Sequence, residues 1–232
     1  MKSFKQHIFE KLKVSKLRLV HHPKSKEELV DLIIKEIETF GPNCSLNHID
    51  VSNIDDMSYL FLGGTVEYSD HPILSSFNGD ISNWDVSNVK DMSYMFESSK
   101  FNGDISNWDV SNVENMRGMF TFSKFNEDIS DWDVLNVEDM SFMFAQSKFN
   151  GDISNWNVSS VENMENMFQT SVFNQDISNW DVSKVKNFRG IFYEATKFNQ
   201  NIDNWKPRKS ALRKEMFKDS PLQKNPPKWF NK

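Results

Sequence analysis

A repeat of 24 residues constrains the fold of this chain more than any other feature of its sequence. Tryptophan recurs at this interval through the middle of the chain, at Trp84, Trp108, Trp132, Trp156 and Trp180. Phe-Asn pairs keep the same step, beginning at Phe77, Phe101, Phe125, Phe149 and Phe173. One such unit cannot bury its own apolar side chains, so self-similar units must stack and cover one another's edges. The sequence therefore predicts a repeat protein with one continuous core.

The boundaries of the repeat follow from the same register. Five regular units cover residues 77–196, and degenerate copies cover 45–76 and 197–232. The first degenerate copy carries an insertion of about 11 residues around residues 63–73. Residues 1–44 lie outside the repeat and predict an N-terminal helical cap. Within them, Ser25 and Glu28 have the spacing of a capping box that starts a helix. We therefore expect a cap over 1–44 and repeats over 45–232.

Each unit is expected to contain a short strand and a short helix. The pattern at residues 105–110 predicts the strand, because its apolar residues include alternate positions. Ser111 and Glu114 resemble a capping box, and the apolar residues over 113–120 have helical spacing. The expected fold class is thus an α/β repeat. It would be a right-handed, leucine-rich-repeat-like solenoid of about seven 24-residue strand–helix coils with an N-terminal helical cap.

The recurring side chains have predicted structural roles. The columns of Trp, Met and Phe are interpreted as core, because they recur in every unit. The asparagine of each Phe-Asn pair is expected to form an internal amide ladder along the stack, like the asparagine of leucine-rich repeats. Two columns of aspartate, beginning at Asp80 and Asp85, are expected to hydrogen-bond to turn amides rather than to bind calcium.

The unit Phe-Asn-x-Asp-Ile-Ser-x-Trp-Asp-Val-Ser-Asn-Val-x-x-Met-x-x-Met-Phe resembles the repeat of the BspA-like bacterial surface protein family. That family is a leucine-rich-repeat variant that is also seen in mycoplasma lipoproteins, and the resemblance covers about residues 45–232. It implies a non-enzymatic scaffold for adhesion or protein binding. Many relatives are secreted or lipid-anchored, whereas this sequence shows no signal peptide or lipobox cysteine. We therefore expect a cytoplasmic protein, with the cell surface or a virion, reached by a non-Sec route, as the alternative.

The sequence contains little that could carry catalysis or bind a cofactor. Cys44 is the only cysteine, and the five histidines lie outside the regular units. We predict no catalytic, cofactor-binding or metal-binding residue, and no enzymatic activity. No apolar run approaches the roughly 18 residues that a membrane span requires, so membrane insertion is not expected.

The distribution of charge suggests what the protein binds. Residues 41–196 hold 24 acidic and 8 basic residues, a net charge of −16, whereas residues 197–232 hold 3 acidic and 10 basic residues, a net charge of +7. An acidic surface repels phosphates, so direct binding to nucleic acid is disfavoured. A protein partner on the acidic solenoid surface is the leading hypothesis. A surface adhesin or phage- or virion-associated binding protein is the first alternative, and a DNA-mimic inhibitor is the second. We expect a monomer or a weak homodimer.

Residues that differ between units at equivalent surface positions are the best candidates for contacting a partner. Aromatic and charged side chains dominate such contacts. The candidates in the repeats are Tyr94, Arg117, Phe122, Phe142, Glu165 and Tyr193. The insertion adds Tyr68 and Asp70.

Overall fold

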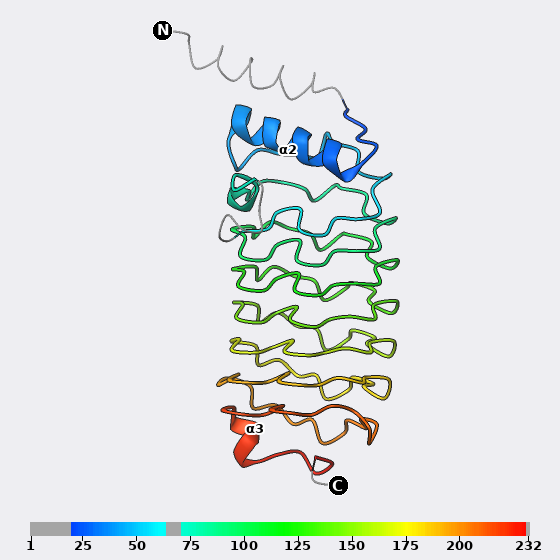
Figure 1. Ribbon diagram of the computed structural model, residues 1–232, viewed down its shortest axis with the longest axis vertical. Helices are drawn as coiled ribbons and strands as arrows, with labels where there is room; N and C mark the ends of the chain where they lie inside the picture. Colours follow the sequence, from blue (N-terminus) through cyan, green and yellow to red (C-terminus); the bar gives the residue numbers. More distant parts are fainter. Residues whose placement is uncertain (1–19, 64–70, 231–232) are drawn as a thin grey trace.

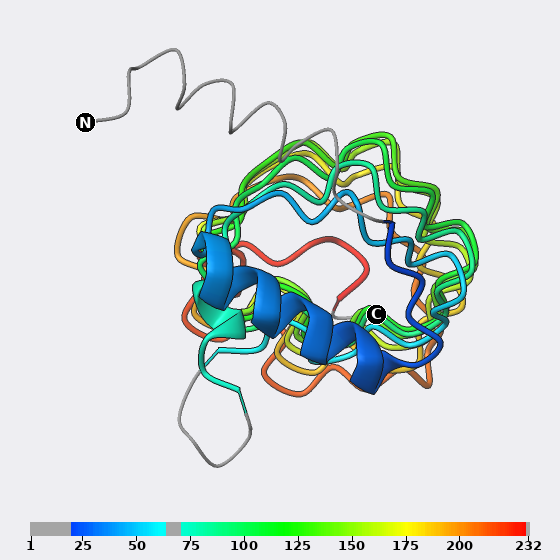
Figure 2. The ribbon, with the colours of Figure 1, turned by 90° about the horizontal axis from the view of Figure 1, so that it is seen from above.

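The computed structural model describes residues 20–63 and 71–230, which form a stack of flattened coils (Figure 1). Three elements of regular structure occur in this part of the chain: helix α2 (Lys26–Phe40), the 3-10 helix η1 (Leu74–Ser76) and helix α3 (Pro221–Lys224). Figure 2 shows that successive coils follow nearly the same outline when the stack is seen from above. Equivalent residues of neighbouring coils therefore lie in columns along the long axis.

Helix α2 begins where the sequence predicts and lies across the N-terminal end of the stack (Figures 1 and 2). The Ser25 hydroxyl accepts a hydrogen bond from the Glu28 N–H at 3.3 Å, and the Glu28 carboxylate accepts one from the Lys24 N–H at 2.8 Å. The helix ends at Gly41, whose φ of +87° stops the helical path. Leu29, Ile33 and Ile37 are buried in the same core as the coils, so α2 covers the apolar edge of the first coil.

The strand predicted over residues 105–110 is wrong, because turns break this segment every few residues. Asp104 Oδ1 accepts the Ser106 N–H at 3.0 Å, and the Trp108 N–H donates to the Ile105 carbonyl at 3.2 Å. The same pair of bonds recurs five residues later along the coil. An aspartate that captures the amide two residues ahead bends the backbone and competes with strand pairing. Within the described residues, the coils are joined by isolated parallel bridges and not by a sheet.

The helix predicted over residues 113–120 is also wrong. Gly118 has a φ of +62° and Phe122 a φ of +56°, values that an α-helix cannot contain. The amide hydrogens instead alternate between two kinds of partner. The Met119 N–H donates to the carbonyl of Met116 at 3.3 Å, whereas the Gly118 and Phe120 N–H groups donate to the next coil at 2.8 and 2.9 Å. This alternation satisfies the buried backbone without a helix.

These two corrections overturn the expected fold class. The coils are not strand–helix units, so the α/β solenoid of leucine-rich-repeat type is contradicted. The spacing of apolar residues in a succession of three-residue turns is close to that of a helix, which explains the error. What the structure has is a stack of turn-rich coils with a cap of one helix at the N-terminal end.

The core is made of aromatic columns, as predicted. Phe120 stacks on Phe125, five residues later in the sequence, at 4.3 Å between ring centroids. It also stacks on Phe96 of the preceding coil at 5.7 Å. The Trp132 indole is buried, and its Nε1–H donates to the Ile105 carbonyl of the preceding coil at 3.1 Å. Rings and indole hydrogen bonds therefore join each coil to its neighbours in the same way.

The predicted amide ladder is present, but its predicted internal position is wrong. The Asn126 N–H donates to Asn102 Oδ1 at 2.8 Å, and the Asn150 N–H donates to Asn126 Oδ1 at 2.7 Å. The ladder lies on the exposed side of the coils rather than in the interior. Its bonds tie neighbouring coils together outside the apolar core.

Candidate functional site

Two rows of exposed aspartates run along the stack, and we call them the first and second acidic rows. The first row consists of Asp80, Asp104, Asp128, Asp152 and Asp176. The second row consists of Asp85, Asp109, Asp133 and Asp181, with Asn157 at the equivalent position of one coil. Each member accepts the N–H of the residue two positions ahead at 2.8 to 3.2 Å, which confirms the predicted role in turns.

In many of these turns, the hydrogen bonds that the aspartate accepts also lower the pKa of its carboxyl group. The pKa values of Asp104, Asp128 and Asp152 lie below the ordinary value, first because the backbone N–H of the following serine donates to the carboxylate and then because its hydroxyl does. The second row behaves alike at Asp109, where the Ser111 hydroxyl is the larger cause. The first row is therefore a regular array of exposed carboxylates whose pKa values all lie below the ordinary value.

No group of three or more histidine, cysteine, aspartate or glutamate side chains that could hold a metal ion occurs in residues 20–63 and 71–230. The histidines of this part lie near the N-terminal cap. His22 Nδ1 lies 2.8 Å from Asp50 Oδ2, and His48 Nε2 lies 3.4 Å from Glu36 Oε2. Cys44 is buried nearby in sequence.

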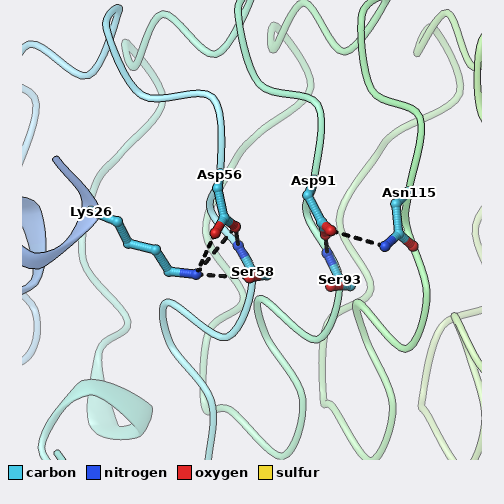
Figure 3. A network of polar contacts seen from close by, with 6 residues as sticks. All are labelled: Lys26, Asp56, Ser58, Asp91, Ser93 and Asn115. Atoms are coloured by element: carbon cyan, nitrogen blue, oxygen red, sulfur yellow. Dashed lines mark hydrogen bonds and ion pairs between the residues drawn. The ribbon is translucent and has the colours of Figure 1, made fainter.

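A third polar column lies at the positions of the parallel bridges and joins α2 to the stack (Figure 3). Asn115 Nδ2 donates to Asp91 Oδ2 at 3.0 Å, so an amide lies beside a carboxylate. Asp56, in the first coil, is approached instead by Lys26 of α2, whose Nζ lies 3.1 Å from both carboxylate oxygens and 2.7 Å from Ser58 Oγ. The lysine approaches Asp56 from the side of α2, whereas the amide that contacts Asp91 comes from the following coil.

The electrostatics of Asp56 reflect this arrangement. Burial raises the pKa of its carboxyl group, but hydrogen bonds from Ser58 and then from Lys26 outweigh burial and hold the pKa below the ordinary value. The Asp56 carboxylate therefore remains ionised beside Lys26.

Four side chains form a continuous strip on the surface of consecutive coils, and we call Tyr59, Tyr94, Arg117 and Phe142 the aromatic strip. The Tyr59 and Tyr94 rings stack at 5.1 Å between centroids. Arg117 Nε donates to the Tyr94 hydroxyl at 2.5 Å, and the guanidinium lies 5.1 Å above the centre of the Phe142 ring. The structure therefore brings together three candidates from the sequence, namely Tyr94, Arg117 and Phe142.

The strip occupies positions with a left-handed backbone. Tyr59, Tyr94 and Phe142 have φ between 55° and 60°, whereas the equivalent residue of an intervening coil is Gly118. A side chain in this region costs about 1 kcal/mol or more relative to glycine. Folding alone would favour glycine here, because Tyr59 is 51% exposed and contributes little to the core. The aromatic residues of the strip are thus candidates for a role other than stability.

The remaining candidates lie apart from the strip or have other partners. Glu165 pairs with Arg189 at 3.7 Å, and Tyr193 lies beneath Lys218, whose Nζ is 5.2 Å from the ring centre. Phe122 is 51% exposed. Tyr68 and Asp70 lie outside the described residues. The sequence candidates do not include Tyr59, although aligning residues 50–61 with 85–96 places it at the position of Tyr94.

No helix in the described part of the chain is long and apolar enough to cross a membrane. The stacked coils, their columns and their surface rows define a repeat protein. A family described as "Mycoplasma protein of unknown function, DUF285" matches residues 33–148 and 121–229, and the chain belongs to this family. No curated protein and no solved structure matches the chain.

Proposed function

We propose that this protein is a non-enzymatic interaction module that binds a basic protein partner through its acidic rows. The observation that supports the proposal is the regular array of exposed aspartates, each held in position by its own turn, with lowered pKa values throughout the first row. A row of like charges on a rigid scaffold attracts a cationic surface and accelerates its encounter. Because the carboxylates are already ordered, binding need not immobilise them.

Binding to a defined cationic probe tests this proposal. A fluorescein-labelled peptide of ten lysines is titrated with the protein, and its anisotropy is followed in 0.05 and 0.5 M salt. We expect binding at low salt that weakens at least roughly tenfold at high salt, because salt screens exposed charges. Replacing Asp104, Asp128 and Asp152 together by asparagine should weaken binding about fivefold or more.

A matched variant distinguishes the rows from total charge. Replacing Glu27 and Glu38 by glutamine and Asp31 by asparagine removes the same number of exposed carboxylates from α2, at the end of the stack. This variant should bind within about twofold of the wild-type protein. Equal losses in the two triple variants would contradict a role for the rows.

The second candidate function is adhesion by a surface protein of the BspA-like type. It is favoured by the Phe-Asn-x-Asp-Ile-Ser-x-Trp repeat together with membership of the matched family. In that case, fractionation of the source cells would recover the protein at the cell surface, and binding to envelope glycans would persist in 0.5 M salt. Recovery from the cytoplasm would contradict adhesion.

A further inference from the structure

The two ends of the aromatic strip differ in charge. At the Phe142 end, Arg117 lies over the ring and its Nη1 donates to Ser141 Oγ at 3.1 Å. The strip therefore already holds one guanidinium between aromatic rings, and this cation belongs to the chain itself. Asp139 and Glu165 act electrostatically on Arg117, so the charge at this end is balanced.

At the Tyr59 end, no basic side chain of the described residues pairs with the Glu97 carboxylate in the way that Arg117 lies beside Phe142 at the other end. Burial raises the pKa of the Tyr59 hydroxyl, and Tyr94, Glu97 and Asp91 raise it further, with Arg117 offsetting only part of this effect. Burial also raises the pKa of the half-buried Glu97 carboxyl group. In the described part of the chain, no lysine or arginine forms an ion pair with Glu97. Glu97 lies in the turn that carries Tyr94, because its N–H donates to the Tyr94 carbonyl at 3.2 Å. Among the described residues, this end thus combines an exposed aromatic ring with a carboxylate that has no basic side chain as ion-pair partner.

We propose that Tyr59, Tyr94 and Glu97 form a site for one arginine or lysine side chain of a protein partner. This inference rests on the proposed function, and it assigns a specific anchor to a partner that the acidic rows attract. The face of Tyr59 accepts the cation, in the way that Phe142 accepts Arg117. Glu97 supplies the opposite charge.

Three features favour a cationic occupant over a neutral one. An uncharged side chain would cover the Tyr59 ring but would leave the Glu97 charge further desolvated and unpaired. The stack of Tyr59 on Tyr94 holds the ring in place before the partner arrives, so less order is lost on binding. The acidic rows increase the local concentration of cationic groups around the site.

The test uses two peptides that differ only in charge. One is fluorescein-labelled (Gly-Arg)4, and the other carries citrulline, the neutral isostere of arginine, in place of every arginine. Anisotropy titrations are made in 0.15 M salt with the full chain. The wild-type protein should bind the arginine peptide at least roughly tenfold more tightly than the citrulline peptide.

Substitutions then locate the site. Tyr59→Ala and Glu97→Gln should each weaken binding of the arginine peptide about fivefold, within the range for a cation above an aromatic ring. Tyr59→Phe keeps the ring and should bind within about twofold of the wild type. Phe40→Ala is the matched control, because Phe40 is an aromatic residue of α2 whose exposed fraction, 50%, is close to the 51% of Tyr59. It should also bind within about twofold. Circular dichroism of each variant verifies that the coils remain folded.

The outcomes separate this inference from the proposed function. If Tyr59→Ala and Glu97→Gln bind like the wild type while the triple aspartate variant is weakened, the cation site is overturned and the acidic rows remain supported. Equal losses in Tyr59→Ala and Phe40→Ala would also overturn the site. If the wild-type protein binds neither peptide, both proposals fail.

Discussion

Gly118 occupies a position that combines a left-handed backbone with a close approach between coils. Its φ is +62°, and a Cβ atom at this position would lie 2.3 Å from Cε1 of Tyr94. The missing side chain is what allows the Tyr94 ring to lie over the next coil and to meet Arg117. A single glycine thus shapes part of the aromatic strip.

Gly118→Ala should therefore lower the free energy of unfolding by about 2 kcal/mol, because backbone strain adds to the contact with Tyr94. Urea denaturation measures the change. Gly41→Ala serves as the control, since Gly41 has a φ of +87° but a Cβ atom there would meet nothing within 4 Å. That variant should lose only about 1 kcal/mol, the part due to backbone strain. Equal losses would show that the Tyr94 contact has no influence.

At the residue scale, the sequence identified most members of the aromatic strip but not the contacts that surround them. Variation between equivalent positions pointed to Tyr94, Arg117 and Phe142 because core positions cannot vary in this way. The expectation that such residues are simply exposed was incomplete, since Tyr94 and Phe142 are half-buried against Arg117. Contacts between residues 23 to 25 positions apart depend on how the coils superimpose, which no single unit reveals.

Helix α2 is attached to the coils by a polar contact as well as by its apolar face. Lys26 joins the helix to Asp56 and Ser58 of the first coil (Figure 3). Because α2 shields the apolar edge of the stack, we expect this contact to stabilise the packing of α2 on the first coil.

Lys26→Met should lower the free energy of unfolding by about 1 kcal/mol, because it leaves the partly buried Asp56 without its cation. Hydrogen exchange of the α2 amides should accelerate in the same variant. Lys35→Met is the control, as Lys35 is exposed on the same helix and should be nearly neutral. Adding Asp56→Asn to Lys26→Met should recover part of the loss. No recovery would mean that the charge of Asp56 is not responsible.

The tryptophan column joins coils through one indole hydrogen bond each. In the middle of the stack, Trp132 is buried, and its removal takes away one of the two hydrogen bonds that the Ile105 carbonyl accepts, the other being from the Trp108 N–H. At the C-terminal end, Trp229 is half-buried and donates to the Ile202 carbonyl at 2.8 Å.

Trp132→Phe should lower the free energy of unfolding by about 2 to 3 kcal/mol, through the lost hydrogen bond between coils and the lost volume in the core. Trp229→Phe should lower it less, by about 1 kcal/mol, because Trp229 is only half-buried and its truncation removes less volume from the core. Thermal denaturation compares the two. A larger loss at Trp229 would indicate that the end of the stack limits stability.

Local patterns mislead the assignment of elements within the coils for a physical reason. The Asp-x-Ser sequence beside the predicted strand closes a turn, since the carboxylate captures the amide two residues ahead. The segment with helical spacing is too short to be a stable helix alone, and its amides bond to the next coil instead. Helix α2 is predicted correctly because its cap, its apolar face and its final glycine all lie within one segment.

At the scale of the whole molecule, turns closed by ionised aspartates recur along the entire stack. These groups have a pKa below the ordinary value, so their contribution to stability is present above the pKa of an unfolded aspartate, about 3.9. The contribution is lost as the pH falls further, through the lowered pKa of the folded state. The melting temperature should thus be steady from about pH 7 to 5 and fall below about pH 4.

The variant with asparagine at 104, 128 and 152 tests the cause of this fall. Asparagine still accepts the turn amide, as Asn157 does at 3.2 Å from the Ser159 N–H, but it does not titrate. The melting temperature of the variant should therefore decrease less between about pH 5 and 3 than that of the wild type. An identical decrease would assign acid sensitivity to other groups.

The sequence by itself determined the repeat, its register, the core columns, the asparagine ladder and the capping helix. Each of these depends on a pattern that recurs every 24 residues or lies within one short segment. Tertiary structure decided the path of each coil and the assembly of the aromatic strip. The backbone amides of one coil bond either to carbonyls of their own turn or to carbonyls of the next coil. The second kind of bond exists only once the coils are stacked.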